Sequence, residues 1–211
     1  MSRTGCRSSS CSPCTGPRSW GLGIKDYFAK PEQVVEGQLR LRQKYRHDCL
    51  VAFYYAAAEI EAWGGEVRFF DDGPPNAGAP FITDPGMIAS LRPPEVARVP
   101  VLCRVLETIA GLKARVGGEV PIFGVVMSPF ALPVMQMGFE AYLNLLLHDR
   151  PRFQALMEVN VAFSTAWAQA QLAAGATAIC YFDPLLSPTI LPYDLLLVRQ
   201  DGGRQQRIEV T

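Results

Sequence analysis

The sequence predicts an α/β fold built around a parallel sheet. Strand-like runs, loops and helical segments alternate several times along the 211 residues, as expected when each strand is followed by a helix. The apolar runs 120–126 and 177–182 are continuous, which is typical of strands covered on both faces. The helical segments 99–118 and 151–175 both end at glycine, a common helix stop. We count about four strands, fewer than the eight of a closed (β/α)8 barrel.

The first half of the chain alternates helical and extended segments. Residues 30–46 predict a helix, because a proline suits its first turn and apolar residues recur at helical spacing. A short apolar run at 47–55 and a helix over 56–65, stopped by paired glycines, follow. Residues 66–70 are rich in strand formers, and 71–80 have the Pro and Gly content of a loop.

The second half gives clearer signals. Residues 99–118 carry an apolar stripe at the i, i+3, i+4 spacing of an amphipathic helix. The predicted elements are, in order, helix 99–118, strand 120–126, a break at 127–138, helices 139–149 and 151–175, and strand 177–182.

Composition excludes several classes of function. Twenty basic and twenty acidic residues cancel, which leaves no long-range field for nucleic acid or acidic lipid. The longest apolar candidate for a membrane span, 120–137, is interrupted by three prolines. Residues 1–20 lack the apolar core of a secretory signal. We therefore expect a single cytoplasmic domain that takes a small, neutral, buried ligand or an organic cofactor.

The six cysteines fall into two groups. Three of them form a C-x4-C-x2-C cluster within residues 6–14, a spacing that could hold metal. The surrounding Ser, Arg, Gly and Pro, without a partner histidine, favour a disordered tail instead. Cys49, Cys103 and Cys180 lie among apolar residues, where a thiol acts as a small hydrophobic side chain.

Several polar residues follow predicted strands, where parallel-sheet enzymes place their substrate-handling groups. Asp183 directly follows the last apolar strand and is the best candidate, because packing alone does not explain an acid there. Ser128 follows the preceding strand and either contacts a ligand or caps the next helix. Asp71, Asp72 and Asn76 lie in the Pro/Gly loop and either face a ligand or form a solvated turn.

Two acids and two histidines are less decisive. Glu59 and Glu61 are two residues apart, so they cannot share one helix face. One is expected to point inward, with Glu59 kept as a binding candidate. His148 is expected to be a helix-end residue favoured by the helix dipole, and His47 precedes a strand without further signal.

Three separated stretches carry a resemblance to a known family: AAAEIEAWGGEVRFFDDGPPN, VPIFGVVMSPFALPVMQMG and AAGATAICYFDPLLSPTILP. Together they resemble the uroporphyrinogen decarboxylase superfamily, over about residues 24–192. The resemblance implies a (β/α)8 barrel of which this chain holds the first half to two-thirds, with its site at the strand carboxyl ends. Residues 1–23 and 193–211 are then expected to be a foreign or disordered tail and an irregular tail.

The superfamily contains both decarboxylases and methyltransferases, and residue types help to separate them. The resemblance implies that decarboxylases hold the pyrrole nitrogens of the substrate with an aspartate, because a carboxylate accepts converging N–H donors strongly. Aligned on Gly64, this chain has Tyr55 at that position, where it either replaces the carboxylate or fills space. A tyrosine near Met135 and a serine near Pro184, expected in a decarboxylase, are also missing.

The methyltransferase branch fits the E-x-E-A-x-G pattern at residues 59–64. The resemblance to this branch implies that zinc binds an acceptor thiol, such as coenzyme M, and holds it as a thiolate. The thiolate then takes a methyl group from a corrinoid. The ligands implied are a His-x-Cys pair and a distant Cys in the last third of the family's barrel. The His-x-Cys spacing of this chain, His47 with Cys49, instead lies within the first short apolar run, and His148 has no cysteine two residues on.

No metal ligands are therefore assigned. Zinc is expected for the methyltransferase branch, with its ligands outside this chain, and no cofactor is expected for a decarboxylase. The expected partner is a corrinoid protein or a tetrapyrrole, and a homodimer is left open. The remaining strands should follow residue 192, so we expect a truncated methyltransferase-branch protein. The alternatives are a uroporphyrinogen decarboxylase and a non-catalytic tetrapyrrole- or corrinoid-binding remnant.

Overall fold

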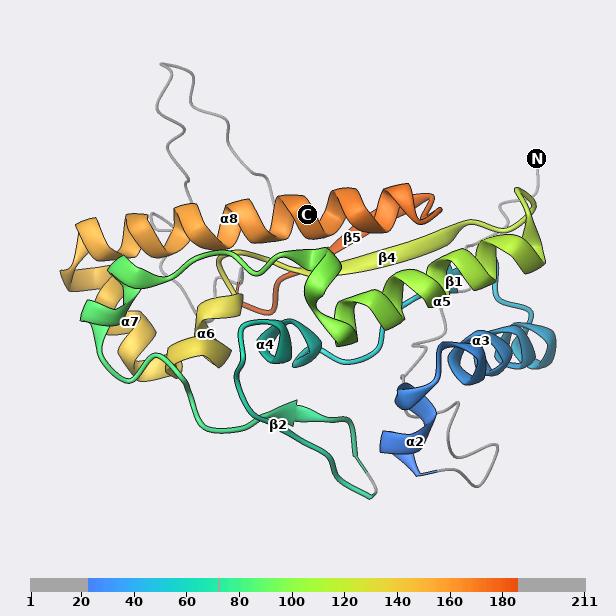
Figure 1. The fold of residues 1–211 in the computed structure, drawn as a ribbon, viewed down its shortest axis with the longest axis horizontal. Helices are drawn as coiled ribbons and strands as arrows, with labels where there is room; N and C mark the ends of the chain where they lie inside the picture. Colours follow the sequence, from blue (N-terminus) through green and yellow to red (C-terminus); the bar gives the residue numbers. More distant parts are fainter. Residues whose placement is uncertain (1–22, 72, 186–211) are drawn as a thin grey trace, which may run out of the picture.

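The structure is a computed structural model that describes residues 23–71 and 73–185. Its centre is a parallel sheet of three strands in the order β1–β4–β5, formed by Leu50–Val51, Ile122–Met127 and Ala178–Phe182. Helices α5 (Pro100–Val116) and α8 (Arg150–Ala173) run along opposite sides of β4 (Figure 1). The predicted α/β class with a parallel sheet is confirmed.

The other elements surround this sheet. Helix α3 follows α2 and lies beside α5, and helices α6 and α7 lie near the N-terminal end of α8 (Figure 1). The helices predicted over 30–46, 99–118, 139–149 and 151–175 are confirmed as α3, α5, α7 and α8. The remaining bounds are α2 Ile24–Ala29, α3 Pro31–Tyr45, α4 Ala58–Ala62, β2 Val67–Arg68, β3 Asn76–Ala77, η1 Pro85–Ser90, η2 Val96–Arg98, α6 Leu132–Met137 and α7 Phe139–His148.

The strand predicted at 66–70 does not join the parallel sheet. Only Val67–Arg68 is extended, as β2, and it pairs antiparallel with β3. The Pro/Gly stretch 71–80 is therefore part of a hairpin, which lies apart from the parallel sheet at the bottom of Figure 1. Each of the four predicted strand runs contains a strand in the described residues, β1, β2, β4 and β5, but only three of these strands form the parallel sheet.

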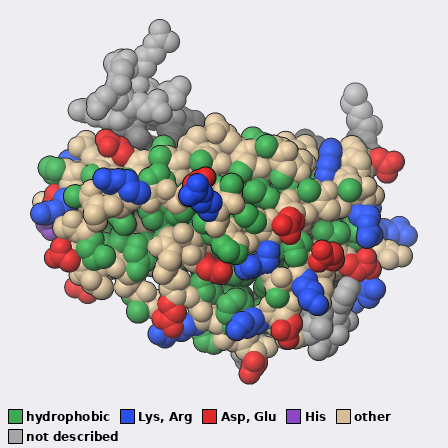
Figure 2. All heavy atoms as spheres, viewed as in Figure 1, with side chains coloured by type: hydrophobic (Ala, Val, Ile, Leu, Met, Phe, Trp, Pro, Cys, Tyr) green, Lys and Arg blue, Asp and Glu red, His purple; other side chains and the backbone are tan. Residues whose placement is uncertain are grey.

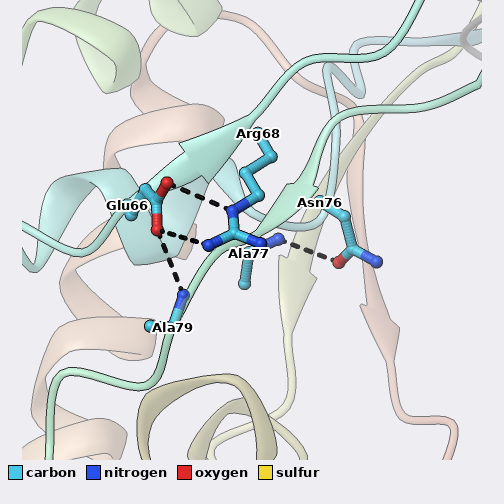
Figure 3. A network of polar contacts seen from close by, with 5 residues as sticks. All are labelled: Glu66, Arg68, Asn76, Ala77 and Ala79. Atoms are coloured by element: carbon cyan, nitrogen blue, oxygen red, sulfur yellow. Dashed lines mark hydrogen bonds and ion pairs between the residues drawn. The ribbon is translucent and has the colours of Figure 1, made fainter.

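A side-chain network explains the hairpin (Figure 3). The Glu66 carboxylate accepts from Nε and Nη2 of Arg68, at 3.1 and 3.3 Å, and from the Ala79 N–H at 3.2 Å. The Asn76 side chain accepts from the N–H of Ala77 at 2.9 Å. A Cβ at Gly78 would collide with the Glu66 side chain, so glycine permits this close approach. The Pro and Gly content of residues 71–80 correctly indicated a turn, but it did not predict that β2 and β3 pair.

The segment 127–138, predicted as a break, contains helix α6. Proline is compatible with a helix at its first turn, where its missing N–H has no intrahelical partner to lose, and α6 has proline there. The helix ends at Gly138, whose φ of 86° suits glycine.

The core lies between the sheet and the helices. The apolar stripe predicted for α5 is confirmed, because its residues Val101, Leu102, Val105, Ile109 and Leu112 are all buried. Strand β5 departs from its prediction, since Tyr181 and Phe182 are 52% and 46% exposed. Cys180 on the same strand is exposed, so its interpretation as a buried hydrophobic side chain is wrong. A continuous apolar run does not reveal whether anything covers the strand.

The surface is mixed in charge. On the face shown in Figure 2, Lys and Arg are interspersed with Asp and Glu, and no region carries one sign alone. None of the helices in the described ranges is long and apolar enough to span a membrane.

Strand β1 covers only the first part of its edge of β4. The N–H groups of Leu50 and Ala52 donate to the carbonyls of Pro121 and Phe123, each at 2.9 Å. The carbonyls of Pro121, just before β4, and of Phe123 thus face β1, whereas the Ile122 carbonyl accepts from the N–H of Thr177, just before β5, at 2.7 Å. Beyond Phe123 the same edge needs other hydrogen-bond partners, because buried backbone groups are nearly always paired.

Side chains complete this edge. Gln171 of α8 is fully buried, and its amide accepts from the Val125 N–H and donates to the Val125 carbonyl, both at 3.0 Å. Ser164, also on α8, donates to the Met127 carbonyl at 3.4 Å. Helix α8 therefore acts as a hydrogen-bond partner of the strand as well as an apolar cover.

Gly124→Ala is expected to lower the free energy of unfolding by about 1–3 kcal/mol, because overpacking forces neighbours out of place. A Cβ there would collide with the Gln171 amide oxygen and lie 2.9 Å from the Ile179 Cδ1. Urea unfolding measures the change. The matched control is Gly118→Ala, where no atom lies within 4 Å of the added Cβ. Equal losses of unfolding free energy in the two variants would contradict the close packing of the Gln171 amide against β4.

Candidate functional site

The carboxyl ends of β4 and β5 lie side by side, with Met127 in register with Phe182. Ser128 and Asp183 follow directly, and the Ser128 hydroxyl donates to Asp183 Oδ2. Two candidates from distant parts of the sequence are therefore brought into contact at the predicted edge of the sheet. Their contact follows from the parallel register of the strands that precede them.

The Ser128–Asp183 pair also organises its own loops. The Ser128 hydroxyl accepts from the N–H groups of Phe130 and Ala131 at 3.0 and 3.1 Å, which agrees with the alternative that it caps the turn before α6. Asp183 Oδ1 accepts from the Leu185 N–H at 2.9 Å. The geometry therefore shows a structural role for both residues, and a ligand contact stays a prediction.

Tyr142 of α7 is a residue near this pair that the sequence did not single out. Its side chain is fully buried, and its hydroxyl has no hydrogen-bond partner within the described ranges. Burial first, and then the nearby Asp183 charge, raise the pKa of Tyr142. A tyrosine inside an apolar helix gives no sequence signal for where its hydroxyl points.

Glu59 lies on α4 and points inward, where it meets the end of β4. Its side chain is buried, with the residue 4% exposed, and Oε1 accepts from the Met127 N–H at 2.8 Å. Glu61 has a half-exposed side chain. The prediction that one of the two acids points inward is confirmed, and the structure identifies it as Glu59.

The environment of Glu59 favours its neutral form. Burial raises its pKa to about 8, and the Met127 N–H only partly opposes this shift. The Trp167 indole lies next to the carboxyl group, but outside hydrogen-bond geometry, so Oε2 is buried without a partner in the described part of the chain. Glu59 thus completes the open edge of β4 as a protonated side chain at neutral pH.

Tyr55 lies beyond the carboxyl end of β1 and is joined to two charged residues. Its hydroxyl donates to Glu61 Oε2 at 2.9 Å, and Glu61 Oε1 lies 3.6 Å from Nη2 of Arg104 on α5. Burial and the Glu61 charge raise the pKa of Tyr55, so the phenol stays neutral. The sequence analysis did not single out Arg104, which occupies a polar position within an amphipathic helix.

Tyr55, Glu61 and Arg104 line a pocket of about 320 Å³. Its other walls come from α2 and from the residues around β2, including Lys25, Phe28 and Phe69. Neither Glu59 nor the Ser128–Asp183 pair is among its lining residues. The carboxyl side of the sheet therefore presents two separate features, a loop-ordering pair and an open pocket.

The hairpin residues lie elsewhere. Asp71 is exposed in the hairpin between β2 and β3, and Asn76 bonds to its own neighbour in β3. Neither follows a strand of the parallel sheet, because β2 and β3 form a separate two-stranded sheet. Asp72 lies outside the described residues, as do the cysteines within residues 6–14 and the two tails predicted from the resemblance.

The described side chains do not fit a zinc site. In residues 23–71 and 73–185, no three His, Cys, Asp or Glu side chains are grouped so that they could hold a metal ion. His148 is the last residue of α7, as expected for a helix-end residue. No step through zinc is derived from these residues.

A family profile and individual relatives of this chain point to the same protein family. The profile described as uroporphyrinogen decarboxylase (URO-D) matches residues 16–196. The methylcobamide:CoM methyltransferase MtaA of Methanosarcina barkeri is 28% identical over 90 residues, which cover 43% of this chain and 26% of that protein. The uroporphyrinogen decarboxylase of Verminephrobacter eiseniae is 25% identical over 158 residues, covering 72% of this chain and 42% of that protein.

A solved methyltransferase from Methanosarcina mazei has the same fold. It superposes with a TM-score of 0.77 at 20% identity and covers 86% of this chain and 54% of that chain. The described elements are thus part of a (β/α)8-type barrel whose sheet is open in the described ranges. The chain spans between a quarter and a half of the length of the relatives it matches. With its profile match over most of its length, the chain belongs to the uroporphyrinogen decarboxylase (URO-D) family.

Proposed function

We propose that this chain forms part of a methyltransferase-branch protein, which transfers a methyl group between a methylcorrinoid and a thiol. The observation that supports it best is Tyr55 at the carboxyl end of β1. The resemblance places the substrate-holding aspartate of a decarboxylase at this position. Here a neutral phenol donates a hydrogen bond to Glu61.

The neighbouring acid does not replace that aspartate. Glu61 accepts from Tyr55 through one oxygen and faces Arg104 through the other. A carboxylate already engaged by a donor and a cation is a weaker acceptor for the converging N–H groups of a tetrapyrrole. The pocket wall at this point therefore suits a ligand that does not need four N–H groups to be held by one acid.

Relatives add support for the branch and for a partner. One is named a methylcobamide:CoM methyltransferase, and we propose a methylcorrinoid, carried by a corrinoid protein, for this chain as well. Zinc in such a protein would hold the acceptor thiol as a thiolate. The part played by the described residues is to shape the site: Tyr55, Glu61 and Arg104 hold one wall, and Ser128 with Asp183 orders the loops after β4 and β5.

Uroporphyrinogen decarboxylation is the second candidate. It is favoured by the longer matches to decarboxylases, 158 to 161 residues against 87 to 90 for the methyltransferases. The length of a match reflects a shared fold as well as shared chemistry. Tyr55 instead stands at the position that the resemblance assigns to the substrate-holding aspartate. A binding experiment separates the two.

The test is a titration of the full chain, followed by tryptophan fluorescence, with methylcobalamin and in parallel with uroporphyrinogen III kept reduced under anaerobic conditions. We expect methylcobalamin to bind at least about tenfold more tightly, a difference of about 1.4 kcal/mol. Tyr55→Asp is not expected to confer porphyrinogen binding by itself. Tighter binding of the porphyrinogen would overturn the proposal in favour of the decarboxylase, and binding of neither ligand would overturn it without favouring the decarboxylase.

A further inference from the structure

The pocket beside Tyr55 has an apolar wall made of aromatic rings. Phe28 and Phe69 each meet the Tyr55 ring edge to face, with centroids 5.3 and 5.6 Å apart and interplanar angles of 69° and 74°. Such packing fixes the rings. Phe28 and Tyr55 are each only 3% exposed, so the half-buried Phe69 offers most of the apolar surface of these three rings. A pocket of about 320 Å³ lies at the small end of the range for ligand sites.

Its charged residues leave an excess of positive charge. Lys25 and Arg104 supply two cations, and Glu61 supplies one carboxylate. The Lys25 ammonium lies 6.0 Å from the centroid of Phe69, above its ring. Since Glu61 is engaged by Tyr55 and faces Arg104, the remaining positive charge would attract an anionic ligand.

Arg104 has donors to spare. Its Nη2 is 3.6 Å from Glu61 Oε1, longer than a hydrogen bond between an N–H and an oxygen. Its Nε is buried and makes no hydrogen bond to any described residue. A buried donor without a partner is costly, and the guanidinium fork matches the two oxygens of a carboxylate.

We propose that this pocket binds a small organic monoanion, a carboxylate on a flat apolar body, with Arg104 as its specificity-determining residue. The apolar body packs mainly against Phe69, which Tyr55 holds in place edge to face, and the carboxylate takes the unused donors of Arg104. Lys25 adds attraction from the rim. The inference adds a small-ligand subsite to the wall used in the proposed function, and its probes are measured separately from methylcorrinoid and porphyrinogen binding.

The test uses three probes of similar size and different charge, phenylacetate, phenylacetamide and 2-phenylethylamine, titrated into the full chain with chemical shifts as the readout. Phenylacetate is expected to bind most tightly and the amine most weakly. Arg104→Gln should weaken phenylacetate by about tenfold to a hundredfold, the range for a hydrogen bond to a charged group, and leave the amide little changed. Lys25→Gln, at an exposed position, should weaken phenylacetate by only a few fold, consistent with about 1 kcal/mol or less for an exposed charge.

The matched control is Arg98→Gln. Arg98 lies at the end of η2, is largely exposed and pairs with Glu95 at 2.9 Å, so its loss should leave phenylacetate binding unchanged. Thermal melting of each variant shows that it is folded, and Lys25→Gln keeps the test open if Arg104→Gln unfolds. Tightest binding by the amine, equal binding by all three probes, or equal effects of Arg104→Gln and Arg98→Gln would overturn the proposal. Failure of methylcobalamin binding would leave the expected order of these probes as it is.

Discussion

Glu59→Gln is expected to abolish most of the pH dependence of the free energy of unfolding between about pH 5 and pH 8. In the folded chain the Glu59 pKa is raised from 4.5 to about 8. Between these values the folded state binds more protons than the unfolded state, so stability falls as pH rises. A shift of this size corresponds to a loss of roughly 4–5 kcal/mol across the window.

A glutamine at position 59 can keep the hydrogen bond that the folded state makes there. Its amide oxygen can still accept from the Met127 N–H, the bond that Glu59 makes at the end of β4, but it has no proton to lose. We therefore expect the variant to resemble the natural protein near pH 5 and to exceed it in stability by a few kcal/mol near pH 9. Urea unfolding at several pH values measures both the slope and the crossover.

Glu158→Gln is the matched control, because Glu158 is an exposed acid on α8. Its unfolding free energy should follow that of the natural protein at every pH. If Glu59→Gln keeps the same pH slope as this control, the buried carboxyl is ionised in the folded protein at neutral pH and the explanation given for the edge of β4 is wrong.

Local sequence signals predicted the long helices and failed where pairing depends on distant residues. Helix α5 shows its apolar stripe directly, and the glycine after α8 marks its end. The hairpin of β2 and β3 depends on Glu66 reaching Ala79, a contact between residues whose composition indicates only a strand followed by a loop. The exposed face of β5 was likewise hidden, because hydrophobicity reports what a strand would bury and not what is present to cover it.

The site was predictable to the extent that strand order determines it. Ser128 and Asp183 each follow an apolar strand, and a parallel register brings them together. The partners that give the site its electrostatics were missed. Arg104 and Tyr142 lie inside helices, where periodicity explains their neighbours and says nothing about the direction of a single polar group.

A second large effect is expected at a buried amide pair that joins α6 to α8. Gln136 and Asn160 are both fully buried, and their side chains exchange two hydrogen bonds, each at 2.9 Å. Replacing one member leaves the donor and the acceptor of the other without partners, and each such group costs about 1–3 kcal/mol. Gln136→Met and Asn160→Leu, which nearly preserve side-chain shape, should each lower the free energy of unfolding by roughly 2–4 kcal/mol.

The double variant distinguishes an orphaned partner from a simple packing defect. When both amides are replaced by apolar side chains, no buried polar group is left unpaired, and the two side chains can pack against each other. We expect Gln136→Met with Asn160→Leu to be more stable than either single variant, with a coupling energy of about 2 kcal/mol or more in urea unfolding. Additive losses would instead mean that each residue contributes through shape alone. Because α6 directly follows the Ser128 turn and α8 hydrogen-bonds β4 through Gln171, this pair also determines how firmly the carboxyl edge of the sheet is held.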